Sequence, residues 1–128
     1  MDLREAERAM DSPVIGDDTL PQMFESSAAR NEADVAQRYK GGVYDRSLVA
    51  DNVVPAAPVG DYADLTYAEM REVVRRLAAG FRELGVGAGD RVGIFANTRM
   101  EWAQCDLSIL AAGGVVTTVY SGSSERQT

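Results

Sequence analysis

Few residues in this chain have types that could carry out chemistry, and histidine is missing altogether. The 128 residues include no histidine and a single cysteine, Cys105. A Ser-His-Asp triad, a Cys-His pair and the usual zinc sites therefore cannot be built within the chain. Carboxylates remain, but no two of them are paired in an evident pocket. We predict no catalytic, cofactor-binding or metal-binding residue in this sequence.

Asn97-Thr98-Arg99 is the first candidate for a binding loop. It follows a short apolar segment that we predict to be a parallel strand, and α/β proteins bind ligands where such strands end. Thr98 is explained as a helix cap, and Asn97 suits a tight turn. Arg99 could reach an anionic group, but a surface arginine is the better interpretation.

The second candidate is the glycine-rich run Gly85-Val86-Gly87-Ala88-Gly89. A dinucleotide-binding loop follows a strand and opens a helix, because the helix N-terminus supplies amides to the phosphates. Here the glycines follow a predicted helix and open a strand. This reversed order disfavours nucleotide binding, and no GxxxxGK[ST] motif occurs around Lys40, the only lysine.

Three further features have simple structural interpretations. Trp102 is interpreted as a core or interface residue and Cys105 as a packing residue within a helix. The hydroxyl-rich segment 120–124 is interpreted as a connecting loop, because it contains no lysine to hold a phosphate.

Helix signals begin at Thr19, which forms a predicted capping box with Gln22. A short strand is expected at Val35–Lys40, with a tight turn at Gly41-Gly42. Residues 43–62 are expected to be a loop, since they contain two prolines and a Gly-Asp pair.

A second capping box, Thr66 with Glu69, opens a longer helix that Gly85 ends. Apolar residues recur behind it at spacings of three and four, which indicates one buried face. They are Met70, Val73, Val74, Leu77, Phe81 and Leu84.

The predicted fold class is α/β, with a parallel βαβ unit preceded by amphipathic helices. Its strands are expected at about 91–96 and 115–120, joined by a helix over about 100–112. Thr98 and Glu101 give that helix a third predicted capping box. Ser124 and Gln127 have the spacing of a fourth.

Composition limits the class of protein. Net charge is −7, so nucleic acids and anionic membranes are disfavoured partners. Such an acidic surface fits adaptation to high salt, or equally a codon bias toward arginine with an acidic tail. A lone cysteine fits a reducing cytoplasm, and the sequence offers no secretory signal and no transmembrane segment. Residues 1–18 are expected to form a loosely ordered acidic tail.

Taken together, these segments resemble the N-terminal region of adenylate-forming (AMP-binding) synthetases, most closely long-chain fatty acid acyl-CoA synthetases. The resemblance covers about residues 19–127 and depends on the order and spacing of several short pieces. These are TLPQMF at 19–24, AQRYK at 36–40, LTYAE at 65–69, LAAGF at 77–81, LGV at 84–86, GDRVGIF at 89–95, Asn97 with Glu101-Trp102, and AAGGVV at 111–116.

The resemblance implies an enzyme that uses ATP and Mg²⁺ to activate a fatty acid as an acyl-adenylate and then forms acyl-CoA. The family's lysine-bearing loop, its aromatic-Gly-x-Thr-Glu motif, its ribose-binding aspartate and its C-terminal lysine do not occur here. We therefore expect residues 19–128 to be a truncated N-terminal part of such a domain. It would bind no cofactor and be inactive alone, with an unknown oligomeric state. The alternatives are a stand-alone, non-catalytic α/β interaction module and a small carboxylate enzyme.

Overall fold

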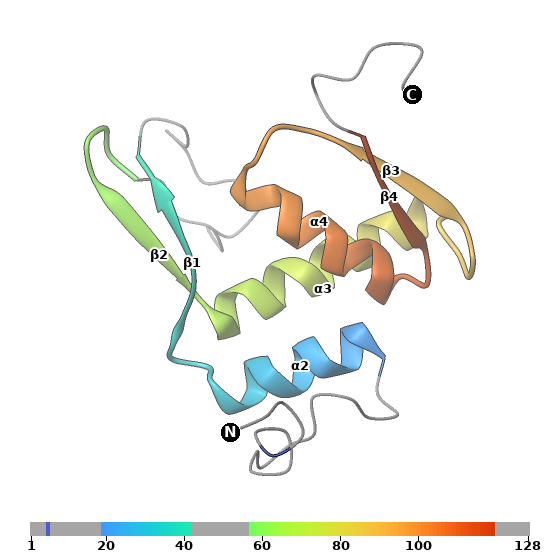
Figure 1. Cartoon of the computed structure of the whole chain (residues 1–128), viewed down its shortest axis with the longest axis horizontal. Helices are drawn as coiled ribbons and strands as arrows, with labels where there is room; N and C mark the ends of the chain where they lie inside the picture. The colour runs from blue at the N-terminus through green and yellow to red at the C-terminus, as the bar shows by residue number, and fades with distance from the viewer. Residues whose placement is uncertain (1–4, 6–18, 42–56, 120–128) are drawn as a thin grey trace.

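The computed structural model describes residue 5 and the segments 19–41 and 57–119. Within these segments, three packed helices separate two small sheets (Figure 1). The antiparallel sheet contains β1 (Val35–Lys40) and β2 (Tyr62–Thr66), and the parallel sheet contains β3 (Arg91–Phe95) and β4 (Val115–Val119). The fold is mixed α/β, as predicted.

Helix α2 (Leu20–Arg30) starts as its sequence predicts. The Gln22 amide donates to the Thr19 hydroxyl oxygen at 3.4 Å, and the Thr19 amide donates to the Gln22 side chain at 2.8 Å. This reciprocal pair satisfies amides that the first turn of a helix leaves without partners. The predicted first capping box is therefore confirmed.

Helix α3 (Tyr67–Glu83) begins with the same device. The Glu69 amide donates to Thr66 Oγ1 at 3.2 Å, and Glu69 Oε1 accepts from the Thr66 amide at 3.2 Å. At the other end Gly85 has φ +102°, a left-handed conformation that glycine adopts without a Cβ clash. Both the second capping box and the predicted stop are confirmed.

The buried face of α3 forms the centre of the core. Met70, Val73 and Val74 pack with Leu65 from β2 and Tyr39 from β1. Each large aliphatic side chain removed from water stabilises the fold by about 1.5–3 kcal/mol. Two ion pairs, both at 2.7 Å, flank this core: Arg75 pairs with Glu25 of α2, and Arg71 pairs with Glu32, which follows the end of α2.

Strand β2 was not predicted. The expected loop at 43–62 is wrong at its last residue, Tyr62, where this strand begins. Tyr62 pairs with Lys40 and Leu65 with Gln37 in an antiparallel register. The pairing partner of β1 is thus distant in sequence, and the predicted tight turn at Gly41-Gly42 extends outside the described residues. Gly41 lies so close to the Pro58 carbonyl that a Cβ would not fit there. Residues 42–56 lie outside the described part of the chain.

The predicted parallel unit is confirmed. Arg91 is opposite Val115 and Phe95 is opposite Val119, with α4 (Met100–Ala111) between the two strands in sequence. Helix α4 contacts both strands and packs against α3. None of the helices in the described segments is long and apolar enough to cross a membrane.

Candidate functional site

The loop at the carboxyl end of β3 leads directly into α4, as expected for a ligand-bearing position in a parallel sheet. Asn97, Thr98 and Arg99 are all exposed. The predicted third capping box is wrong, because Arg99 is the N-cap residue and no side chain caps the helix. The helix begins at Met100, as predicted, but its N-cap is Arg99 and not Thr98, so Glu101 occupies the second helical position instead of the third that a capping box requires.

Glu101 instead forms an ion pair with Arg99, the N-cap residue of α4. Arg99 Nε donates to Glu101 Oε2 at 3.2 Å, and Arg99 Nη2 donates to Oε1 at 3.3 Å. Arg99 is therefore held by a carboxylate beside it. Any anion binding to Arg99 would compete with this neighbour.

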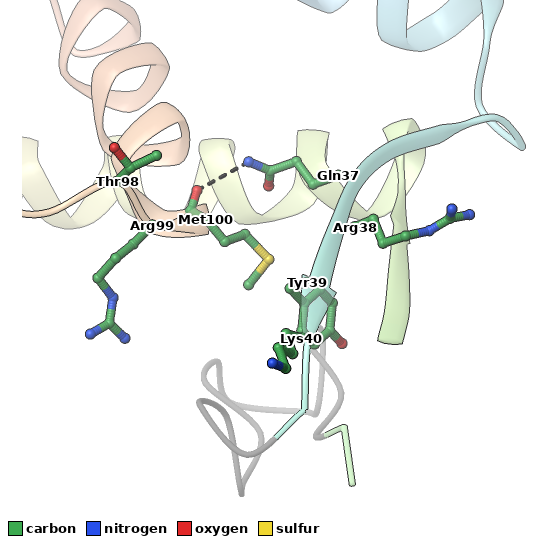
Figure 2. A pocket seen from close by; sticks show the side chains of 7 residues that line it. All are labelled: Gln37, Arg38, Tyr39, Lys40, Thr98, Arg99 and Met100. Carbon is green, nitrogen blue, oxygen red and sulfur yellow. Dashed lines mark hydrogen bonds between the residues drawn. The ribbon is translucent and has the colours of Figure 1, made fainter. Parts of the chain in front are cut away.

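A hollow of about 420 Å³ separates this loop from β1. Its walls come from two segments, Gln37, Arg38, Tyr39 and Lys40 on one side and Thr98, Arg99 and Met100 on the other. In Figure 2 the Met100 side chain reaches towards β1, whereas Arg38 points to the opposite side of the strand. The lining of the hollow is thus partly apolar, and cationic side chains lie at its edge.

Two glutamines hold the two walls together. Gln37 Nε2 donates to the Met100 carbonyl at 3.1 Å, drawn as the dashed line in Figure 2. Gln104 Nε2 then donates to Gln37 Oε1 at 2.9 Å. Gln104 is buried at 2% exposure, so this link lies inside the fold. Sequence reasoning missed both residues, although Gln104 and Ser108, polar residues four apart in α4, offered a signal.

Arg38 is engaged on the far side of β1. Its Nε donates to Asp64 Oδ1 at 2.6 Å and its Nη2 to Oδ2 at 3.2 Å. The hydrogen bonds from Arg38 hold the pKa of Asp64 below its ordinary value, and Asp64 in turn raises the pKa of Arg38. The pair lies across the antiparallel ladder and is exposed to solvent.

The glycine-rich run uses its amides within the fold. Gly87 N–H donates to Asp90 Oδ2 at 2.8 Å, and Gly89 N–H donates to the Gly113 carbonyl at 3.0 Å. Gly114 packs against Ile109 and Val86 so closely that a Cβ would meet both. The run therefore connects α3 to β3 and fastens the start of β3 to the start of β4.

The other candidates have structural surroundings. Trp102 and Cys105 are half-buried in α4, and burial raises the pKa of the Cys105 thiol, which keeps it protonated at neutral pH. Segment 120–124 and the predicted fourth capping box lie outside the described residues. Within the described segments no three acidic or cysteine side chains gather in a way that could hold a metal ion.

Comparison with known proteins defines the class. The family model described as AMP-binding enzyme matches residues 35–128. The chain belongs to this family of adenylate-forming enzymes.

Two relatives of this chain are mycobacterial fatty acid–CoA ligases. The long-chain-fatty-acid–CoA ligase FadD15 of Mycobacterium tuberculosis is 48% identical over 68 residues, which are 53% of this chain and 11% of that protein. A medium/long-chain-fatty-acid–CoA/3-oxocholest-4-en-26-oate–CoA ligase of Mycobacterium marinum is 36% identical over 93 residues, which are 73% of this chain and 15% of the relative. The chain therefore spans only a small part of the length of these relatives.

Solved structures agree on the fold. The N-terminal subdomain of Klebsiella oxytoca NpsA superposes with a TM-score of 0.61 at 24% identity, covering 84% of this chain and 23% of that chain. The nonribosomal peptide synthetase FmoA3 gives a TM-score of 0.64 at 23% identity, covering 94% of this chain and 10% of its own. The described residues thus have the fold of part of an N-terminal subdomain of adenylate-forming enzymes.

Proposed function

We propose that this chain supplies the N-terminal part of an ATP-dependent long-chain fatty acid–CoA ligase and is inactive alone. The observation that carries the proposal is the 48% identity to FadD15 within a chain that matches the AMP-binding family over residues 35–128. A match to an acetyl-coenzyme A synthetase of Methanothrix thermoacetophila is weaker, at 36% over 67 residues. This difference favours a long-chain acid as substrate over acetate.

The proposed reaction has two steps. The fatty acid carboxylate attacks the α-phosphorus of ATP and releases pyrophosphate, which gives an acyl-adenylate. The thiol of coenzyme A then attacks the acyl carbon and AMP leaves. Adenylation makes the second step feasible, because AMP is a far better leaving group than the oxygen of a free carboxylate.

Within this proposal the residues of this chain act as a scaffold. The parallel strands β3 and β4 place the loop at residues 97–99 at one edge of a sheet, where α/β enzymes bind ligands. No three acidic or cysteine side chains gather among the described residues, and the glycine run uses its amides internally, so we propose that other parts of the enzyme hold ATP and Mg²⁺. We assign residues 19–128 to the truncated domain and place the enzyme in the cytoplasm.

A chimera tests the proposal. In it, this chain replaces the matching segment of M. tuberculosis FadD15, and acyl-CoA formation is followed by mass spectrometry with acids of two to eighteen carbons. We expect thioesters of the long acids and none in reactions with the isolated chain. A folded chimera that forms no thioester, or that prefers acetate, would refute the proposed substrate class.

A further inference from the structure

We propose that the hollow between β1 and the loop that leads into α4 binds a small phosphate monoester that carries an apolar group. The hollow has a volume of about 420 Å³, and Lys40 and Arg99 are the cations that would hold the phosphate. The inference is independent of the proposed function, because it concerns binding to this chain alone. It adds a ligand class and the side chains that recognise it.

The size and the walls of the hollow suit a small molecule. Pockets that bind small organic molecules have volumes of roughly 300–1,000 Å³. The two walls are joined by the hydrogen bond from Gln37 to the Met100 carbonyl and by the bond from Gln104, which is buried, to Gln37. A ligand would therefore not have to order the walls, which lowers the entropic cost of binding.

The charge of the lining differs from that of the whole chain. The chain has a net charge of −7, whereas the described residues that line the hollow include three cations and no carboxylate. Arg38 is one of the three, but it pairs with Asp64 and points to the opposite side of β1 in Figure 2. Lys40 and Arg99 come from opposite walls, with the Met100 side chain between them (Figure 2). The lining thus attracts anions in a chain that repels them overall.

The neighbour of Arg99 determines which anion fits best. Glu101 accepts hydrogen bonds from Arg99 at 3.2 and 3.3 Å, so a ligand has to compete with a carboxylate. Both side chains of this pair are partly exposed, and ion pairs of this kind are weak. A phosphate monoester carries close to two negative charges above its second pKa, about 6, and its three oxygens can accept hydrogen bonds from two cations together. A phosphate dianion is therefore favoured over a ligand carboxylate, which has one charge.

The apolar part of the lining specifies the rest of the ligand. Tyr39 is 4% exposed and Met100 is half-buried, and both line the hollow beside the cations. A methionine thioether packs well against aromatic rings and adapts to alkyl groups. Covering these side chains also removes apolar surface from water. An aromatic or alkyl group attached to the phosphate should therefore add affinity that inorganic phosphate lacks.

Nuclear magnetic resonance of the isotope-labelled 128-residue chain tests this site. Phenyl phosphate and butyl phosphate are titrated at about pH 8, where both are dianions. Inorganic phosphate lacks the apolar group, and benzoate carries a single charge. We expect saturable amide shifts at residues 37–40 and 98–100, with at least one ester binding about threefold or more tighter than phosphate or benzoate. The ester that binds more tightly shows whether the ligand is aromatic or alkyl.

Charge variants locate the cations that bind the ester. Lys40→Gln and Arg99→Gln should each weaken binding by about fivefold or more, because each removes a cation from the lining. Glu101→Gln should tighten binding by about twofold to fivefold, since it releases Arg99 from its carboxylate. The matched control is Arg91→Gln, because Arg91 is also an exposed arginine but lies at the start of β3, outside the hollow. It should change affinity less than about twofold.

Several results would overturn the inference. They are no saturable shifts with either ester, shifts confined to other residues, and inorganic phosphate or benzoate binding as tightly as the esters. Equal weakening by Arg91→Gln and Arg99→Gln would also overturn it, because anions would then be attracted by surface charge in general.

The amide spectrum of each variant reports whether it folds. If Lys40→Gln or Arg99→Gln does not fold, the effect of Glu101→Gln decides, and unchanged affinity in that variant counts against the site. A FadD15 chimera that forms no acyl-CoA would contradict the proposed function and leave this binding site unaffected.

Discussion

Gln104 in α4 donates a hydrogen bond of 2.9 Å to Gln37 in β1, across 67 residues of sequence. Gln37 in turn donates a hydrogen bond to the Met100 carbonyl in the first turn of α4. The antiparallel sheet and the start of the helix that follows β3 are thus joined by a buried glutamine, Gln104, and a half-buried one, Gln37. Because a buried amide without a partner is costly, this link fixes one arrangement of the two elements.

The link predicts energetic coupling between the two glutamines. Gln37→Leu and Gln104→Leu should each destabilise the fold by about 1–3 kcal/mol, since each leaves a polar group of the other unsatisfied. The double variant should cost less than the sum of the two, by about 0.5–3 kcal/mol. Urea unfolding of the four proteins measures this cycle. Strict additivity would show that the two side chains do not interact.

The two threonines that sequence analysis placed at helix starts should behave differently. Thr66→Ala should destabilise the chain by about 1 kcal/mol, because Thr66 caps α3. Thr98→Ala should cost less than about 0.5 kcal/mol, since Thr98 is exposed and does not cap α4. Thermal unfolding of both variants compares them. Equal losses would mean that Thr98 caps its helix after all.

Core packing predicts a large contrast between two leucines. Leu65 is 0% exposed and Leu84 is 84% exposed. Leu65→Ala should destabilise the fold by about 2–5 kcal/mol through lost burial and a cavity. Leu84→Ala should change stability by less than about 0.5 kcal/mol. The denaturant midpoints of the two variants measure this contrast. A small loss of stability in Leu65→Ala would contradict the described core.

The ion pair between α2 and α3 predicts a dependence of stability on pH. Hydrogen bonding to Arg75 holds the pKa of Glu25 below its ordinary value, 4.5. The pair therefore stabilises the fold above that ordinary value, and this contribution disappears as pH falls through the lowered folded-state pKa. Both side chains are partly exposed, so the contribution is at most about 1 kcal/mol.

Glu25→Gln should flatten the stability profile between about pH 3 and 6, measured by urea unfolding. Arg75→Gln removes the same pair from the other side and should flatten the profile to a similar extent. A profile that keeps its slope in both variants would show that the pair makes no contribution.

Local signals predicted much of this fold. Thr19 with Gln22 and Thr66 with Glu69 identified two helix starts, since a capping box depends only on residues three apart. The apolar spacing behind Thr66 predicted the buried face of α3, and Gly85 predicted its end. Such features are determined by neighbours in sequence, so they can be read without tertiary structure.

Non-local features were missed for a physical reason. β2 becomes a strand because it pairs with β1, and its Leu65 is buried by α3, neither of which sequence spacing reports. Thr98 and Glu101 have the spacing of a capping box, yet the N-cap is Arg99, and its side chain forms an ion pair with Glu101. The hollow beside β1 likewise depends on the Gln37–Gln104 link between distant segments.

The central claim is that this chain is the N-terminal part of a fatty acid–activating enzyme and cannot catalyse alone. Fatty acid–dependent exchange of labelled pyrophosphate into ATP tests it most directly, because exchange reports adenylate formation without requiring coenzyme A. The account predicts exchange with a long-chain acid in the FadD15 chimera and none in the purified 128-residue chain. Exchange by the isolated chain, or a folded chimera that shows none, would contradict it.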